Sequence, residues 1–305
     1  MSKIAFPELP YESWKETKTT LHLFTQIVGK VRMSLVPKLN HWWHVTFYVT
    51  PRGLTTSYMP CKGGGIEMLF DFRRHYLFIR PGSGETSGIP LRGTSVAEMC
   101  AQVLATMSKL GIKVHIKDDV FDPAKVGSEI PYSQDTEHDT YDPEPVEQYF
   151  KALRGINSVL LRFRGRYLGK CSPVHQFWHS FDLAVTRFSG RVTQVSPQAD
   201  QVTKEAYSHE VSSVGFWPGD NTFPEAAFYS YTHPEPAGLE TQPLEPDRAW
   251  WQKINGTHMA LYKYEDFRKA SRPRKSLLAF CQSSYKAGAI LGKWPREELE
   301  RAKSV

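Results

Sequence analysis

Four histidines stand in two short segments that could bring imidazole groups together. His41 and His44 follow the first expected helix, and His175 and His179 occupy a similar segment in the second half of the chain. Imidazole titrates near neutral pH, so it can act as a general acid or base, as a metal ligand, or as a polar contact for a ligand. The four histidines therefore predict one site, provided that the two segments meet in the fold.

Two carboxylates are expected on strands near these histidines. Asp182 lies early in the otherwise apolar run FDLAV, and Glu210 follows His209 at the start of another strand. A carboxylate in a half-buried sheet needs a partner, because burying an unpaired charge is costly. The candidate catalytic residues are His175, Asp182, His209 and Glu210. We expect them to lie nearer to the main pocket than His41 and His44.

Five further side chains are predicted to contact a ligand in the same region. Arg187 is expected to pair with one of the two carboxylates, and Trp217 offers an aromatic wall before a sharp turn. The ligand-binding set is Arg187, Trp217, His41, His44 and His179. A structural role is the alternative for each, because tryptophans at strand ends usually belong to the core and histidines beside tryptophans usually pack there.

A divalent metal is one alternative at this site. Three or four imidazoles converging with Asp182 or with His209 and Glu210 would suit zinc, iron or manganese. Ligand spacing alone does not define a coordination geometry, so no residue is assigned as a metal ligand and the cofactor is unknown. The four cysteines contain no CxxC pair, which argues against a zinc ribbon and a redox motif.

Two sequence blocks recur in the same order in the two halves. The block Gly29-Lys30, Pro37, Trp43-His44 resembles Gly165-Arg166, Pro173, Trp178-His179, which lies about 136 residues later. The segment from Ser95 to Gly111 matches that from Ser276 to Gly292, 181 residues later. We predict an internal duplication with a pseudo-twofold relation between the copies. The second copy is longer by 45 residues, in the stretch 190–260.

Each copy is predicted to form a helix, an antiparallel meander and a second helix, which places the fold in the α+β class. Amphipathic spacing predicts helices at 12–35, 95–110, about 144–168 and 276–291. Runs of β-branched and aromatic residues predict strands at 44–50, 54–59, 66–72, 76–80, 113–117, 181–188, 209–217, 226–232 and 258–264. The pair Asn255-Gly256 predicts a tight hairpin turn.

The composition of the chain suggests two repeat modules joined by a polar segment. The first module covers 1–120, a linker rich in Asp, Pro and Ser covers 121–143, and the second module covers 144–305 with 190–260 enlarged. In the first helix, His22, Gln26 and Lys30 share one face. Such a polar stripe is typical of a solvent-facing surface, although a sheet cupping the helix would instead place His22 and Gln26 on a cavity floor.

The charge pattern argues against a dedicated nucleic-acid-binding surface. The net charge is +6 over 305 residues, with basic clusters at 162–170 and 268–275 and no recognised binding motif beside them. No apolar run reaches eighteen residues, and the first residues lack the apolar segment of a secretory signal. We therefore expect a cytoplasmic protein without a membrane span.

Several long motifs resemble those of a known family. NHWWH, SPVHQFW, SFDLAVTRFSGR and EAYSHEVSSVGFWPG are similar to segments of a widely distributed family of proteins of similar length and unknown function. The resemblance spans nearly the whole chain and implies a stand-alone soluble protein without an assigned activity. The family pattern tends to have glycine where this chain has His179, which weakens an essential role for that histidine.

The leading functional hypothesis is a cytosolic small-molecule-binding protein with its pocket between the two repeats. The histidines and carboxylates could make it an enzyme, but the sequence does not decide this. The alternative is a nucleic-acid-binding module that uses basic helices and aromatic residues of the sheets. The expected partner is a small-molecule ligand, with nucleic acid disfavoured and no membrane.

Overall fold

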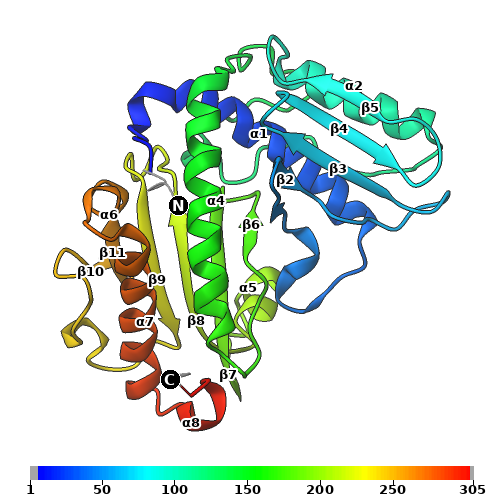
Figure 1. Ribbon diagram of the computed structural model, residues 1–305. Helices are drawn as coiled ribbons and strands as arrows, with labels where there is room; N and C mark the ends of the chain where they lie inside the picture. Colours follow the sequence, from blue (N-terminus) through cyan, green and yellow to red (C-terminus); the bar gives the residue numbers. More distant parts are fainter. Residues whose placement is uncertain (1–5, 303–305) are drawn as a thin grey trace.

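Two antiparallel sheets and the helices packed against them make up the computed structural model, which describes residues 6–302 (Figure 1). The fold is therefore in the α+β class, as predicted. The helices are α1 (Tyr11–Leu35), η1 (Asn40–Val45, a 3-10 helix), α2 (Val96–Lys109), α3 (Pro123–Val126), α4 (Pro143–Gly165), α5 (Gln201–Ala206), η2 (Leu239–Thr241, a 3-10 helix), α6 (Tyr264–Lys269), α7 (Pro273–Leu291) and α8 (Arg296–Leu299). Among residues 6–302, none of these combines the length and apolar character needed to cross a membrane.

The first sheet is a meander in which every strand pairs with the next one along the chain. Its strands are β1 (Tyr48–Val49), β2 (Gly53–Thr55), β3 (Ile66–Asp71), β4 (Tyr76–Pro81) and β5 (Ser87–Pro90), in that spatial order. Alternate residues of β3 and β4, such as Phe70 and Leu77, are fully buried, because strand side chains alternate between faces. These residues share one core with α1 and α2.

The second sheet is a meander of four strands with a two-stranded hairpin added at one edge. Its strands are β6 (His175–Phe177), β7 (Asp182–Val192), β8 (His209–Trp217), β9 (Ala227–His233), β10 (Trp250–Ile254) and β11 (Thr257–Lys263), in the spatial order β10-β11-β9-β8-β7-β6. Asn255 and Gly256 close the β10–β11 hairpin, both with positive φ, as a two-residue turn with Asn-Gly requires. The predicted turn is confirmed.

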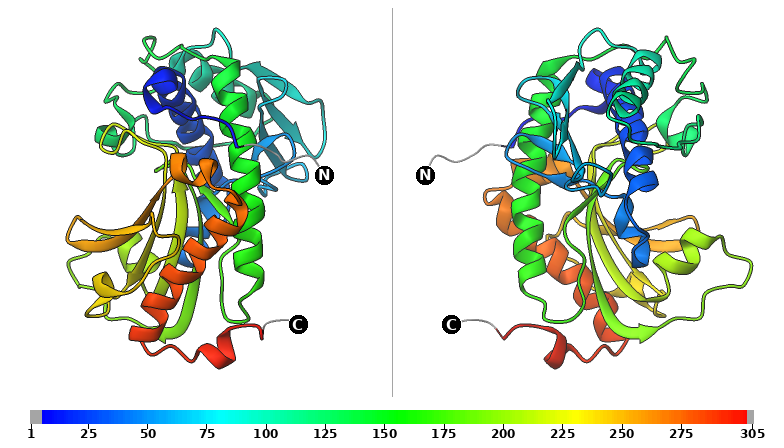
Figure 2. Two further views of the ribbon diagram at one scale, coloured as in Figure 1. Left: turned by 60° about the vertical axis from the view of Figure 1, so that its left-hand side comes forward. Right: turned by 90° about the vertical axis from the view of Figure 1, so that its right-hand side faces the viewer.

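The two faces of the second sheet have different covers. The helices α4 and α7 pack on one face, where they contact β7, β8 and β9. Figure 2 shows α4 on that side and α1 with α5 on the other. The sequence of the second half therefore builds a sheet whose far face is covered partly by the first half of the chain.

The two halves join through their sheets and through their long helices. Phe47, beside β1, and Gln176 of β6 exchange two backbone hydrogen bonds of 2.8 and 2.9 Å. In α1, Gly29 lies directly against the indole ring of Trp178, and in α4 the ring of Phe150 lies 5.5 Å from that of Phe72. One continuous apolar core results.

The element order of the two halves agrees with the predicted duplication only in part. Both halves run from a long helix through a sheet to a second helix, and α2 and α7 end beside the matching pairs Leu110-Gly111 and Leu291-Gly292. The block that begins at Gly29 and recurs at Gly165 does not occupy equivalent positions in the two helices. Gly29 lies inside α1, whereas Gly165 is the last residue of α4. The duplication itself stays a prediction.

The polar stripe of α1 is buried, so its predicted solvent exposure was wrong. Gln26 bonds both the backbone N–H and the backbone carbonyl of Phe121 at 2.9 Å, and accepts a hydrogen bond of 2.7 Å from the hydroxyl of Tyr132. Lys30 donates to Asp119 at 2.5 Å, and His22 bonds the carbonyl oxygen of Trp178 at 2.9 Å. The segment after α2 covers this face of α1 in place of water, and its residues supply the hydrogen-bond partners of Gln26 and Lys30.

The segment 121–143 is correspondingly well packed. It contains α3, and its residues Tyr132 and Asp135 are fully buried. Backbone groups of Asp135 and His138 accept hydrogen bonds from the first turn of α2. The predicted strand at 113–117 is absent from the described structure, whereas β5 was not predicted because its residues SGIP lack a strand-like pattern.

Alanine in place of Ser95 should lower the free energy of unfolding by about 1 kcal/mol. Ser95 caps α2: its hydroxyl accepts from the backbone N–H of Glu98, whose carboxylate accepts from the backbone N–H of Ser95 at 2.8 Å. Urea unfolding measures the change. Ser95→Thr keeps the cap and is the control, so an equal loss in both variants would contradict the capping role.

Candidate functional site

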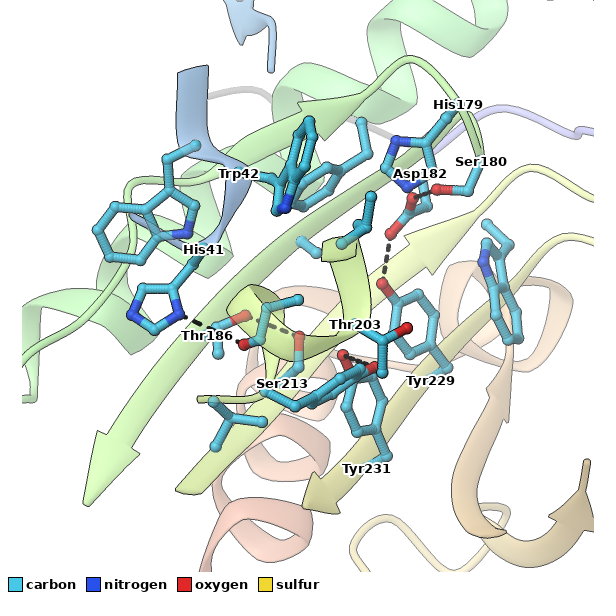
Figure 3. Close-up of a pocket in the computed structure, with 18 of the residues that line it drawn as sticks. His41, Trp42, His179, Ser180, Asp182, Thr186, Thr203, Ser213, Tyr229 and Tyr231 are labelled. Carbon is cyan, nitrogen blue, oxygen red and sulfur yellow. Dashed lines mark hydrogen bonds between the residues drawn. The ribbon is translucent and has the colours of Figure 1, made fainter. Parts of the chain in front are cut away.

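A cavity of about 400 Å³ lies on the face of the second sheet that α4 and α7 leave free (Figure 3). Sites for small ligands commonly measure about 300–1,000 Å³. The first half of the chain contributes His41, Trp42 and Trp43 of η1, together with Phe121, Asp122 and Lys125. The second half contributes Phe177, His179, Ser180, Asp182, Ala184, Thr186, Phe188, Val202, Thr203, Ala206, Tyr207, Val211, Ser213, Trp217, Tyr229, Tyr231 and Met259.

The floor of the cavity consists of hydroxyl groups on three neighbouring strands. Thr186 of β7 pairs with Ser213 of β8, and their hydroxyl oxygens are 2.9 Å apart. Tyr231 of β9 accepts a hydrogen bond of 3.3 Å from Tyr207. These side chains lie on one face because residues two apart in a strand point the same way, and paired residues of antiparallel strands share a face.

Tyr229 lies flat across the floor because Gly215 beneath it has no side chain. A Cβ atom at Gly215 would lie 2.5 Å from Cζ of the Tyr229 ring. The ring stacks on Trp217, with the two centroids 4.3 Å apart, and its hydroxyl donates to Asp182 Oδ2. Gly215 thereby positions the tyrosine that holds the carboxylate.

Asp182 forms the polar end of the cavity. It is 4% exposed, and the hydroxyl of Ser180 donates to its second oxygen, Oδ1. Figure 3 shows His179 beside this carboxylate and Tyr229 reaching it from the floor. Burial, and then the charge of Asp182, raise the pKa of Tyr229 well above its usual value, so the phenol remains a proton donor. Burial lowers the pKa of His179, which the nearby charge of Asp182 opposes.

The roof is a turn in which two residues adopt left-handed backbone angles. His41 and Trp42 have φ values of 55° and 60°, a conformation that costs non-glycine residues on the order of 1–3 kcal/mol each. His41 Nδ1 bonds the carbonyl oxygen of Glu205 at 3.1 Å, while Lys170 donates to Nε2 at 2.5 Å. These bonds require a neutral imidazole, and burial followed by the charge of Lys170 lowers the pKa of His41 accordingly.

Four of the nine predicted site residues line the cavity: Asp182, His41, His179 and Trp217. The expected order of proximity was wrong, because His41 lines the cavity whereas His175, His209 and Glu210 are not among the lining residues. The 3-10 helix η1 brings His41 over the sheet, and no local pattern in the sequence indicates that placement.

His175 and His209 lie on the cavity face of the sheet but outside its lining. His175 pairs with Ala184 and lies under the rings of Trp43 and Tyr48, with centroids 5.8 and 5.5 Å away. Within residues 6–302, neither ring nitrogen of His175 has a hydrogen-bond partner, and burial lowers its pKa to about 3. The His209 ring is 5.7 Å from that of His41. Both histidines therefore pack against lining residues, Trp43 and His41, without lining the cavity themselves.

Arg187 and Glu210 point to the opposite face of the sheet, so the predicted pairing of Arg187 with a site carboxylate was wrong. Arg187 is fully buried, with its guanidinium 3.5 Å from the ring centroid of Phe163 and 4.3 Å from that of Tyr285. Glu210 pairs with Arg191 at 2.7 Å. Successive side chains of a strand point to opposite faces. Arg187 and Glu210 each stand next to a cavity-facing residue, Thr186 and Val211, so both face away.

The predicted histidines do not converge on a metal. His44 accepts a hydrogen bond of 3.3 Å from the backbone N–H of Leu39 and lies outside the cavity lining. In the part of the chain that the structure describes, one group of three ligand atoms has metal-like spacing, at Glu235, Glu240 and His258. Glu240 is exposed and Glu235 half-buried, and His258 already bonds Glu235 at 2.6 Å. All four cysteines are free.

Most residues of the floor and of the roof were not among the predicted site residues. Thr186 follows buried Val185 and Tyr229 follows buried Phe228, so the alternation of faces along the runs 182–188 and 226–232 was the available signal. The signal for Trp42 was the unusual density of aromatic residues in NHWWH. Phe121 carried no local signal, since it lies in an irregular segment.

Comparison with known proteins gives a family but no characterised relative. No curated protein and no solved structure matches the chain. The sequence profile of a family of unknown function, DUF5996, matches residues 6–301. This span includes both sheets, the cavity and every site residue described above. The chain therefore belongs to the DUF5996 family of unknown function.

Proposed function

We propose that this protein binds a small molecule in the cavity between η1 and the second sheet. The supporting observation is the composition of the lining: a hydroxyl-bearing floor, aromatic walls and one buried carboxylate. Small-ligand sites typically combine apolar and aromatic walls with a few placed polar groups. The strained roof at His41 and Trp42 points the same way, since costly backbone conformations concentrate at functional sites.

Binding has more support than catalysis by histidines and carboxylates. Of the four candidate catalytic residues, Asp182 is the one that lines the cavity. The two imidazoles in the lining, His41 and His179, both have lowered pKa values because they are buried. A neutral imidazole can still act as a base, so the residues for proton transfer would be His179 and Asp182, which Figure 3 shows side by side.

The nucleic-acid alternative has weaker support. Arg268 of the second basic cluster pairs with Glu265 and Glu8, and Lys269 also pairs with Glu265. Paired cations contribute less to phosphate binding, because their charge is already balanced. One observation favours nucleic-acid binding: on the first sheet, the guanidinium groups of Arg74 and Arg80 lie over the ring of Phe78. On the second sheet, Phe177, Trp217, Tyr229 and Tyr231 line the cavity instead of an open surface.

Phenylalanine in place of Thr186 should abolish ligand binding while leaving the fold intact. Thr186 is half-buried at the middle of the floor, so a larger ring there would fill the cavity. A ligand at about 100 times its Kd stabilises a protein by about 2.7 kcal/mol. Screening neutral, anionic and cationic metabolites for stabilisation of the wild type, and retesting each positive compound on Thr186→Phe, measures the effect.

The matched control is Val192→Phe, which introduces the same side chain on the same strand at a site that is 74% exposed. It should bind every compound as the wild type does. The proposal fails if no compound stabilises the wild type, or if the compounds that do so bind Thr186→Phe equally well.

A further inference from the structure

Three carboxylates are buried in the described part of the chain, at Asp71, Asp135 and Asp182. Two of them have complete structural partners. Asp71 pairs with Arg52 at 2.6 Å and accepts from the backbone N–H groups of Arg73 and Arg74. Asp135 bonds His138 Nδ1 at 2.9 Å and accepts from two backbone N–H groups. Both hold turns in place.

Asp182 differs from these two because it has no cationic partner. The two groups that donate to it, the hydroxyls of Ser180 and Tyr229, are neutral, and no Lys, Arg or His nitrogen between residues 6 and 302 pairs with it within 4.0 Å. A buried charge without a counter-charge is costly, so a ligand that brings a positive charge to Asp182 would be favoured. Asp182 lines the cavity, so a bound ligand can reach it.

The rest of the lining leaves the negative charge of Asp182 uncompensated. The charged side chains in the lining are Asp122, Lys125 and Asp182, and Lys125 pairs with Asp122 at 3.0 Å. The lining histidines His41 and His179 have lowered pKa values through burial and carry no charge near neutral pH. Lys170 lies outside the lining and donates to His41. The lining therefore carries a net charge of −1.

The aromatic side chains of the lining suit a cation with an apolar body. Trp217 and Tyr229, whose stacked rings are adjacent to Asp182, lie on the floor, and Trp42 and Phe177 contribute further rings. The face of an aromatic ring attracts a cation, most strongly for tryptophan and where water is excluded. Beyond this end, Thr186, Ser213 and Tyr231 offer hydroxyl groups to polar substituents of a ligand.

We infer that the cavity selects small organic cations, namely protonated amines on a compact aromatic or apolar body, with the ammonium group against Asp182. This inference rests on the binding function proposed above and adds the class of ligand. The ammonium group would supply the counter-charge that Asp182 lacks, and the body would pack on Trp217 and Tyr229. A carboxylate or phosphate ligand would instead place a second negative charge beside Asp182, which is unfavourable.

Three probes of nearly equal size and different charge test this selectivity on the full chain. They are 2-phenylethylammonium, the neutral 2-phenylethanol and the anion phenylacetate, and titration calorimetry at neutral pH gives their affinities. We expect the ammonium probe to bind about ten-fold or more tighter than the alcohol, because an ion pair in a water-poor cavity is worth more than a neutral hydrogen bond. Phenylacetate should bind most weakly.

Two substitutions that remove the same charge separate the role of Asp182 from a general effect. Asp182→Asn should lower affinity for the ammonium probe by about ten-fold or more and leave affinity for the alcohol nearly unchanged. Asp122→Asn removes a charge that Lys125 already balances at 3.0 Å, and should retain the preference for the ammonium probe. The preference of the wild type decides the question even if Asp182→Asn does not fold.

The outcomes distinguish this inference from the proposed function. A wild type that prefers the alcohol or phenylacetate, or that binds no ammonium probe at millimolar concentration while other compounds bind and Thr186→Phe blocks them, overturns the inference and leaves the binding function. Equal loss of the preference in Asp122→Asn and Asp182→Asn also overturns it. If no compound of any charge binds the wild type, the binding function fails as well.

Discussion

Alanine in place of Trp178 is expected to lower the free energy of unfolding by about 3–5 kcal/mol, the usual cost of truncating a buried tryptophan. Trp178 is 4% exposed and joins the second half of the chain to α1, where its indole ring lies against Gly29 and its carbonyl oxygen bonds His22. Urea unfolding monitored by far-UV circular dichroism measures the loss. A loss below about 1 kcal/mol would mean that the halves do not depend on this contact.

The same contact predicts that Gly29→Ala destabilises the wild type but stabilises the Trp178→Ala variant. In the wild type a Cβ atom at position 29 would lie 2.3 Å from Cγ of Trp178, so the substitution should destabilise by about 1–3 kcal/mol. In the Trp178→Ala background the obstruction is gone, and alanine should stabilise the helix by about 1 kcal/mol. Gly165→Ala is the control, because no atom lies within 4 Å of its Cβ position. Additive effects in the double variant would contradict the predicted contact.

Acidification from pH 7.5 to pH 5 is expected to cost on the order of 2 kcal/mol of stability through His175 alone. Burial lowers the pKa of His175 to about 3, with further lowering from the charges of Arg32 and Arg164, whereas an unfolded histidine titrates near 6.5. Between pH 6.5 and pH 3, His175 is protonated in the unfolded chain and neutral in the folded chain. Stability is therefore complete above pH 6.5 and is lost as the pH falls toward 3. His22, His41 and His179 add to the loss, since their pKa values are also lowered by burial.

Phenylalanine in place of His175 should remove this part of the pH dependence. Both ring nitrogens of His175 lack partners in the described part of the chain, and its neighbours are aromatic. A phenyl ring should therefore fit and leave stability at pH 7.5 equal or higher. The measurement is the free energy of unfolding in urea at pH 5 and pH 7.5. His115→Phe, at an exposed histidine, is the control and should lose stability as the wild type does. Equal pH dependence in His175→Phe and the wild type would show that His175 is protonated in the folded protein.

Local sequence patterns were sufficient for most of the secondary structure. The amphipathic run 12–35 became α1 at Tyr11–Leu35, because its apolar positions recur at helical spacing and Pro37 prevents continuation. The strand predicted at 209–217 is β8 without change. The turn at Asn255-Gly256 formed because those two residues tolerate positive φ. In each case the cause lies within a few residues of its effect.

Part of the site could also have been read from the strand period. Asp182 and Arg187 are separated by five positions, and His209 and Glu210 are neighbours, so each pair must project to opposite faces of its strand. Arg187 and Glu210 therefore could not join Asp182 and His209 on one face of the sheet. The same period places Asp182, Thr186 and Phe188 together on one face.

Only the tertiary structure decided which face became a site. The helices α4 and α7 cover one side of the second sheet, and the choice of side depends on how they pack against each other and against β7, β8 and β9. The roof comes from η1, more than a hundred residues before the strands it covers, and the polar face of α1 is satisfied by residues 117–132. Contacts between residues so far apart in the sequence depend on how whole helices and strands pack. Residue types and local spacing therefore do not predict them.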